Sequence, residues 1–203
     1  ARLTVAIMPF LKTSKEDAIK AHKAGFEILL HLPMEPVRGK KSWLGPGAIT
    51  TDMSNQEIKD RLRKEIESIP YVVGVNNHMG SKATADPRVM KAVLEVLKEK
   101  NLFILDSKTS QNSKIPEMAK QLGVPFVERT VFLDNKNSKF YIKKQLQFLF
   151  NQARNRGFAV GIGHVGIQGR NTAEVIRDML PIMKKTRLSV VPVSELIPST
   201  PKG

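Results

Sequence analysis

The chain of 203 residues contains no cysteine, which excludes disulfide bonds and thiolate metal ligands. It also lacks any apolar run near the roughly 18 residues that a membrane-spanning helix needs, so no transmembrane segment is predicted. Its first residues show no signal-peptide pattern, because Arg2 is followed by a short apolar segment. The absence of cysteine is compatible with an extracytoplasmic location.

Basic residues are in large excess: 33 Lys and Arg against 19 Asp and Glu give a net charge of +14. Such a charge favours anionic partners such as nucleic acid, phospholipid or an acidic wall polymer. The basic residues are spread along the chain, do not alternate with aromatic residues, and show no helix-turn-helix or zinc-finger spacing. We therefore expect a generally basic, solvated surface and no nucleic-acid partner.

Apolar runs and helical patterns alternate along the whole chain, which predicts parallel strands joined by right-handed helical crossovers. The number of units suggests one α/β domain, residues 1–203, built as a barrel or barrel-like sheet. The predicted strands are Leu3–Phe10, Phe26–Leu32, Tyr71–Asn76, Leu102–Leu105, Val124–Leu133, Phe158–Ile162 and Leu188–Val193. The predicted helices are Lys15–Ala24, one from Ser54 that Pro70 ends, Asp86–Lys100, Ser113–Leu122, Ser138–Arg156 and Asn171–Lys185.

Several of these helices begin with a polar pattern that resembles a capping box. The three examples are Ser14-x-x-Asp17, Ser54-x-x-Glu57 and Asn171-x-x-Glu174. Between the second strand and second helix, residues Pro36–Met53 contain three glycines and the only tryptophan, Trp43. We expect a long loop there, and such loops often serve as lids or binding segments.

Four side chains that are suited to catalysis or metal binding stand at or near the ends of predicted strands: His31, His78, Asp106 and His164. Since the carboxyl ends of parallel strands share one edge of a sheet, we predict that these residues form one site. Neutral imidazole is a common zinc ligand, so His31 and His78 are candidate metal ligands. Glu35 is a candidate third ligand or base, which leaves Asp106 and His164 for proton transfer.

Each of these residues also has a structural interpretation. A single histidine at a strand end is often simply hydrogen-bonded, although three at equivalent positions favour a site. Asp106 is suited to capping the turn that follows it, and Asn76 and Asn77 are common turn formers. Glu35 fits an exposed, proline-flanked turn, and His22 lies on a polar helix face without a predicted role.

Five segments resemble one known family in order along essentially the whole chain. They are HLPMEP (His31–Pro36), GVNNHMGS (Gly74–Ser81), LDSKTS (Leu105–Ser110), RTVFLDN (Arg129–Asn135) and IGH (Ile162–His164). Together they are similar to the divergent polysaccharide deacetylases. This resemblance implies a distorted (β/α) barrel of the polysaccharide deacetylase (NodB-like) type, a divalent metal that is commonly zinc, and hydrolysis of N- or O-acetyl groups on glycans.

The resemblance also assigns residues. His31 resembles the first histidine of the metal motif, while Glu35 stands where a second metal histidine is found. His78 resembles a metal histidine of a neighbouring branch of sugar deacetylases, and His164 resembles the general acid. The family's first strand, which ends in an aspartate pair, has no counterpart here, so we expect that strand to be missing from this sequence rather than lost by the protein.

We predict a metal-dependent hydrolase of the bacterial envelope, located outside the cytoplasm, that removes acetyl groups from a glycan or cell-wall polymer. Catalysis is assigned to His164 and Asp106, the zinc-class metal to His31 and His78. Substrate contacts are assigned to Glu35, Asn77 and Trp43. A catalytically inactive glycan- or wall-polymer-binding module that holds anionic polymers is the alternative, and a metal phosphoesterase is a third possibility.

Overall fold

A computed structural model describes residues 2–166 and 169–197 of the chain. The residues divide into two compact units, each considered by itself. The larger unit holds Arg2–Val127 together with residues 192–197, and the smaller unit holds Glu128–Val191. The prediction of one domain spanning residues 1–203 stays a prediction.

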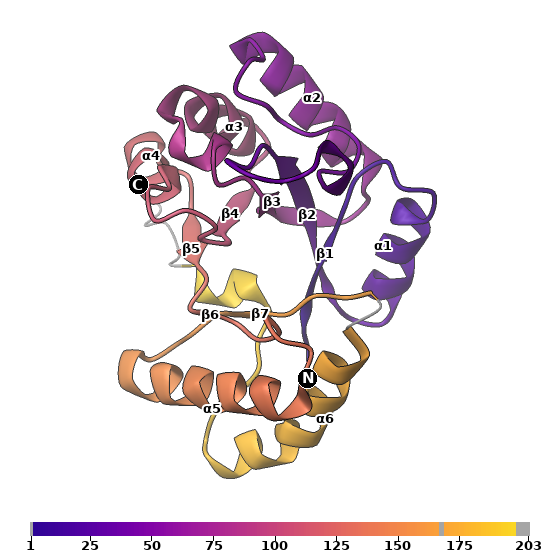
Figure 1. Cartoon of the computed structure of the whole chain (residues 1–203), viewed down its shortest axis with the longest axis vertical. Helices are drawn as coiled ribbons and strands as arrows, with labels where there is room; N and C mark the ends of the chain where they lie inside the picture. Colours follow the sequence, from indigo (N-terminus) through magenta and orange to yellow (C-terminus); the bar gives the residue numbers. More distant parts are fainter. Residues whose placement is uncertain (1, 167–168, 198–203) are drawn as a thin grey trace. The chain divides into compact units, whose positions relative to one another are not determined.

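The larger unit is built on a sheet of five strands in the order β1-β2-β3-β4-β5, and β1 to β4 are parallel. Figure 1 shows helices α1 to α4 arranged around the outside of this sheet. The strands are β1 (Thr4–Ile7), β2 (Glu27–Met34), β3 (Val72–Met79), β4 (Phe103–Asp106) and β5 (Phe126–Glu128). The helices are α1 (Ser14–Lys23), α2 (Asn55–Ser68), α3 (Pro87–Glu99) and α4 (Ile115–Leu122), with short 3-10 turns at η1 (Lys41–Trp43) and η2 (Ala83–Ala85).

The smaller unit has a two-stranded parallel sheet of β6 (Val131–Phe132) and β7 (Gly161–Ile162). Two long helices, α5 (Lys139–Arg156) and α6 (Gly169–Lys185), pack against each other. Their buried side chains form a core separate from that of the larger unit. The 3-10 turn η3 (Val193–Leu196) returns the chain to the larger unit.

Local sequence signals explain several helix boundaries. Ser54 and Glu57 form the predicted capping box at the start of α2, each side chain bonded to the other's backbone N–H. The Asp86 side chain caps α3. Gly123 ends α4 in the left-handed conformation, at φ +68°, which glycine adopts without strain.

Other boundaries were predicted wrongly. Ser14 is the first residue of α1 rather than its cap, because its hydroxyl donates to the Met8 carbonyl and accepts from the Leu11 N–H. Asn171 lies inside α6, where its amide donates to Asn137. Residues 188–193 form no strand, although that segment lies within the described residues.

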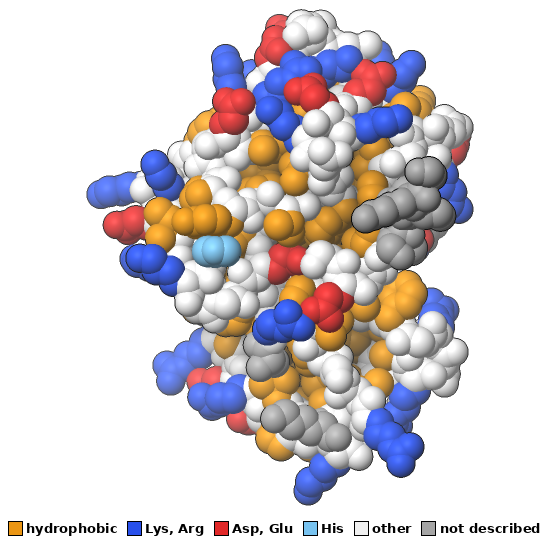
Figure 2. Space-filling model, turned by 180° about the vertical axis from the view of Figure 1, so that it is seen from behind, with side chains coloured by type: hydrophobic (Ala, Val, Ile, Leu, Met, Phe, Trp, Pro, Cys, Tyr) orange, Lys and Arg blue, Asp and Glu red, His pale blue; other side chains and the backbone are white. Residues whose placement is uncertain are grey.

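The fold is α/β with a parallel sheet and interleaved helices, as the alternation predicts. Closure of the sheet into a distorted barrel stays a prediction. Over residues 2–166 and 169–197, no helix is long and apolar enough to cross a membrane. Basic side chains are spread over the face shown in Figure 2 rather than gathered in one patch.

Candidate functional site

Two neighbouring strands bring a histidine pair together. β2 and β3 align so that His31 lies opposite Asn76 and Pro33 opposite His78. Since alternate residues of a strand point to the same face, His31 and His78 share one face of the sheet. Nε2 of His31 lies 3.1 Å from Nδ1 of His78, with ring centroids 4.9 Å apart. His31 lies inside β2, which continues to Met34, and His78 is the penultimate residue of β3.

A hydrogen-bond network fixes the proton on His31. The Ser107 hydroxyl donates to the Asn77 carbonyl, so its oxygen accepts from the Asn76 amide nitrogen. That orientation turns Oδ1 of Asn76 toward Nδ1 of His31, 2.9 Å away. Because an amide oxygen only accepts, Nδ1 of His31 must carry the proton. Nε2 then carries a lone pair that faces His78.

A hydrogen bond to the backbone of Trp43 fixes the tautomer of neutral His78. Its Nε2 lies 3.0 Å from the backbone carbonyl oxygen of Trp43, which only accepts, so this nitrogen donates. Nδ1 of neutral His78 therefore also carries a lone pair. Two such nitrogens 3.1 Å apart repel each other unless they share a proton or both bind one cation. Asn76 and the Trp43 carbonyl thus leave the two inner nitrogens as acceptors when both rings are neutral, and metal binding by this pair stays a prediction.

The geometry fits two ligands of a zinc-class ion. Zn–N bonds of about 2.0–2.1 Å at the tetrahedral angle place two ligand nitrogens about 3.3 Å apart, close to the distance between His31 and His78. Bonding of the outer nitrogen to a carbonyl oxygen is also how metal-bound histidines are usually oriented. Within the described residues, however, no group of three or more His, Asp or Glu side chains is arranged to hold a metal ion. The pair is therefore an incomplete ligand set.

Glu35 bonds to residues of the loops that follow β2 and β3. Its carboxylate accepts from the Lys82 ammonium and from the N–H and hydroxyl of Thr51, each at 2.7 Å. Partial burial raises the pKa of the Glu35 carboxyl, but these hydrogen bonds outweigh it, and the pKa lies below its ordinary value. Its role as a metal ligand, base or substrate contact stays a prediction.

Three further predicted residues surround the strand ends of the larger unit. Asn77 is buried, and its amide bonds to the Ser107 N–H, the Met79 carbonyl and the Thr109 hydroxyl. Asp106 is buried at the end of β4 and accepts from the Lys108 N–H, as expected for a turn cap. The Trp43 side chain is exposed. Their assigned roles in catalysis or substrate binding stay predictions.

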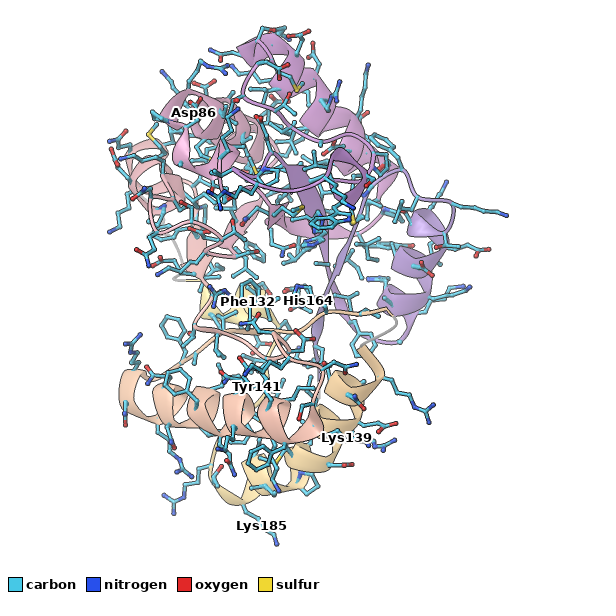
Figure 3. All side chains as sticks on the ribbon, in the orientation of Figure 1. Asp86, Phe132, Lys139, Tyr141, His164 and Lys185 are labelled. Atoms are coloured by element: carbon cyan, nitrogen blue, oxygen red, sulfur yellow. The ribbon has the colours of Figure 1, made fainter. Side chains whose placement is uncertain are left out.

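His164 lies in the smaller unit, next to Phe132 (Figure 3). Its Nδ1 is 2.8 Å from Oδ1 of Asp134, and its backbone N–H donates to Oδ2 of the same carboxylate. The Thr172 hydroxyl also donates to Oδ2. Burial raises the pKa of Asp134, but these three bonds outweigh it and lower that pKa. The predicted union of His164 with His31 and His78 in one site stays a prediction.

Sequence reasoning missed the residues that orient the histidines. Asp134 has no predicted role, because 30 residues separate it from His164 in the sequence. Asn76 was considered only as a turn former, although it lies buried within β3. The sequence does contain a signal for another carboxylate at a strand end, because Asp134 directly follows the apolar pair Phe132-Leu133.

A model of the divergent polysaccharide deacetylase family matches residues 1–197. The chain belongs to this family. It is 38% identical over 162 residues to the uncharacterized protein YibQ of Escherichia coli K12, and 36% identical to an uncharacterized protein of Haemophilus influenzae. Each match covers 80% of this family member but only 50% and 57% of the relatives, so the chain spans about half their length.

A solved structure supports the fold of this member of the family. The uncharacterized protein ATU2773 of Agrobacterium tumefaciens superposes with a TM-score of 0.83 over 96% of this chain and 88% of that one. The two sequences are only 22% identical, so the likeness establishes the arrangement of elements and no activity. The resemblance found in the sequence motifs is thereby confirmed at the level of family and fold.

Proposed function

We propose that this divergent polysaccharide deacetylase is a metal-dependent hydrolase that removes acetyl groups from an envelope glycan outside the cytoplasm. The observation that supports the proposal is the pair of histidine nitrogens, His31 Nε2 and His78 Nδ1, which lie 3.1 Å apart. Such a pair is suited to binding a cation. Family membership supplies the class of reaction.

In this proposal, His31 and His78 hold a zinc-class ion. When bound, such an ion supplies Lewis-acid polarisation of a carbonyl and a lowered pKa for water beside it. Two histidines leave further coordination positions to be filled by water or by residues beyond this pair. Asn76 and the Trp43 carbonyl hold the two rings so that neither must turn when the cation binds.

His164 is proposed to protonate the departing amine or alcohol. Its Nδ1 faces the Asp134 carboxylate, which leaves Nε2 for proton transfer. Because Asp134 accepts from both the ring and the backbone N–H of His164, it fixes the orientation of the imidazole. Proton transfer by a positioned side chain of this kind typically contributes about 10²–10⁴-fold to a rate.

The remaining predicted roles belong to the same proposal. The exposed Trp43 ring is suited to stacking on a sugar, and its carbonyl bond to His78 links that contact to the histidine pair. Asn77, from β3, and Glu35 are proposed to contact the substrate, and Asp106 is proposed to take part in proton transfer. The basic surface would favour a polymer that also carries anionic groups.

Release of acetate tests the proposal. Purified, zinc-loaded protein is incubated with acetylated glycans of several classes, and free acetate is measured. We expect activity in the wild type and in His22→Ala, a control at an exposed histidine of α1, and loss of activity in His31→Ala and His164→Ala. Equal acetate release by all four proteins, at the level of buffer alone, would contradict the proposal.

The alternative is a catalytically inactive module that binds glycan or wall polymer. One observation favours it: Glu35, which stands where the family has a metal histidine, is engaged by Lys82 and Thr51 rather than by the histidine pair. This module would bind anionic polymer without metal, and its binding would weaken steeply with salt. Polymer binding unaffected by chelators, together with absent acetate release, would favour this function.

A further inference from the structure

The outward face of α5 combines exposed aromatic rings with positive charge. Phe140 is 69% exposed and Phe148 is 47% exposed, while Ile142 and Leu146 on the opposite face are buried in the smaller unit. At about 100° per residue, the exposed positions between residues 140 and 148 fall in a sector about 140° wide. The two phenyl rings stand about 12 Å apart along the helix. The exposed side chains of this sector are not part of the hydrophobic core of the smaller unit.

The charge of this helix has one sign only. Residues 139–156 contain five basic residues and no acidic one, and residues 128–191 contain twelve basic and four acidic residues. Of those acids, Asp134 is engaged by His164, and Glu174 pairs with Lys139 and Arg170. Lys143 and Lys144 lie in the exposed sector between the two phenylalanines. Figure 3 shows side chains that project outward from the α5 ribbon.

We propose that this face of α5, defined by Phe140, Lys143, Lys144 and Phe148, docks on the surface of an anionic phospholipid bilayer. Phenyl rings enter the boundary between headgroups and acyl chains, and lysines contact the lipid phosphates. The lysine stems are long enough to lie along the apolar boundary while their ammonium groups reach the headgroups. The helix lies parallel to the bilayer and does not enter its core.

Two features favour a bilayer over a soluble polyanion. A polyanion needs only the lysines, and it gives no reason for two exposed phenyl rings beside them. A single-stranded nucleic acid would stack its bases on ring faces, but the Lys144 ammonium lies over the Phe140 ring, 4.6 Å from its centroid. A ring whose face is covered in this way still offers its edge to lipid. Positive charge on α5 and negative charge on the bilayer are complementary.

Vesicle binding tests this proposal. The full chain is sedimented with vesicles of phosphatidylcholine alone and with vesicles of equal parts phosphatidylcholine and phosphatidylglycerol. We expect binding to the anionic vesicles, and binding on the order of tenfold or more weaker for Phe140→Ser/Phe148→Ser. The matched control is Phe158→Ser, which removes a phenyl ring that is also 47% exposed but lies outside α5. It should bind like the wild type.

Charge needs its own control, because any strongly basic protein associates with anionic vesicles. Lys143→Glu/Lys144→Glu is compared with Lys12→Glu/Lys15→Glu, an equal charge change on exposed lysines near α1. We expect a clearly larger loss of binding from the α5 variant. Thermal unfolding of each variant confirms that it is folded.

Three results would overturn the proposal. The wild type fails to bind anionic vesicles, the phenylalanine variant binds as well as Phe158→Ser, or the two charge variants lose binding equally. Single-stranded DNA and heparin serve as soluble polyanions in a parallel assay. Binding of either that falls with the phenylalanine substitutions as strongly as vesicle binding would assign the face to a polyanion instead.

Discussion

The carboxyl of Glu65 provides the sharpest stability prediction. Glu65 lies on α2, is 0% exposed, and neither of its carboxyl oxygens has a hydrogen-bond partner among the described residues. The side chain packs against Gly47, where an added Cβ would stand only 2.5 Å from Oε1. Burial raises the pKa of Glu65 to about 9, with a smaller opposing effect from the charge of Arg61. The folded protein therefore carries Glu65 as a neutral acid at pH 7.

This pKa makes stability depend on pH in a definite direction. Between pH values near 4.5 and 9, the folded chain retains a proton that the unfolded chain releases. The free energy of unfolding must then fall as pH rises through this range, by up to about 1.4 kcal/mol per pH unit. Over the whole range the loss reaches roughly 6 kcal/mol as an upper bound, because water entering the site reduces the penalty. A typical domain has about 5–15 kcal/mol in total.

Glu65→Gln isolates this effect, since it keeps the shape of the side chain and removes its titration. Urea unfolding is followed by circular dichroism at several pH values between 5 and 9. We expect the stability of the wild type to decrease toward pH 9 and that of the variant to change much less. Glu67→Gln, an exposed position on the same helix, is the control and should follow the wild type. Parallel pH dependences for the wild type and Glu65→Gln would refute the reasoning.

Three other substitutions test separate parts of the structure. Asp134→Asn removes the charge beside His164 and should lower acetate release by roughly 10²–10⁴-fold while leaving metal content unchanged. Loss of metal from this variant would contradict the role of Asp134 as the residue that orients His164. Glu35→Gln weakens the bonds that hold the loop after β2 and should lower the unfolding free energy by roughly 1–3 kcal/mol in urea. Gly74→Ala places a Cβ 2.8 Å from the Phe103 ring and should destabilise by roughly 1–3 kcal/mol in thermal unfolding. An unchanged melting temperature for Gly74→Ala would show that the ring moves freely.

The order of elements could be predicted from sequence because it depends on local patterns. Alternating apolar runs and amphipathic segments located β1 to β4 and α1 to α5 within a few residues. The Ser54 capping box was also confirmed, since it acts within one turn of its own helix. The cap predicted at Ser14 was wrong because its hydroxyl bonds to the segment before the helix. A sequence pattern does not show which of two nearby backbone partners a hydroxyl will choose.

The candidate site depends on contacts between distant residues, so it was only partly predictable. His31 and His78 were identified from their positions near strand ends, and the parallel register of β2 and β3 brings them together. The residues that orient them act across 45 and 35 positions: Asn76 on His31, and Trp43 on His78. These partners could not be predicted from local sequence patterns, because only the fold places their oxygens beside the imidazole rings.

Metal content tests the central claim, that His31 and His78 form a metal-binding pair, most directly. Elemental analysis is applied to the wild type, His31→Ala, His78→Ala and the control His22→Ala after equilibration with zinc and removal of the excess. We predict about one zinc ion per chain in the wild type and the control, and a loss of that zinc in both site variants. Equal zinc content in all four proteins, or none in the wild type while it remains folded, would contradict the account.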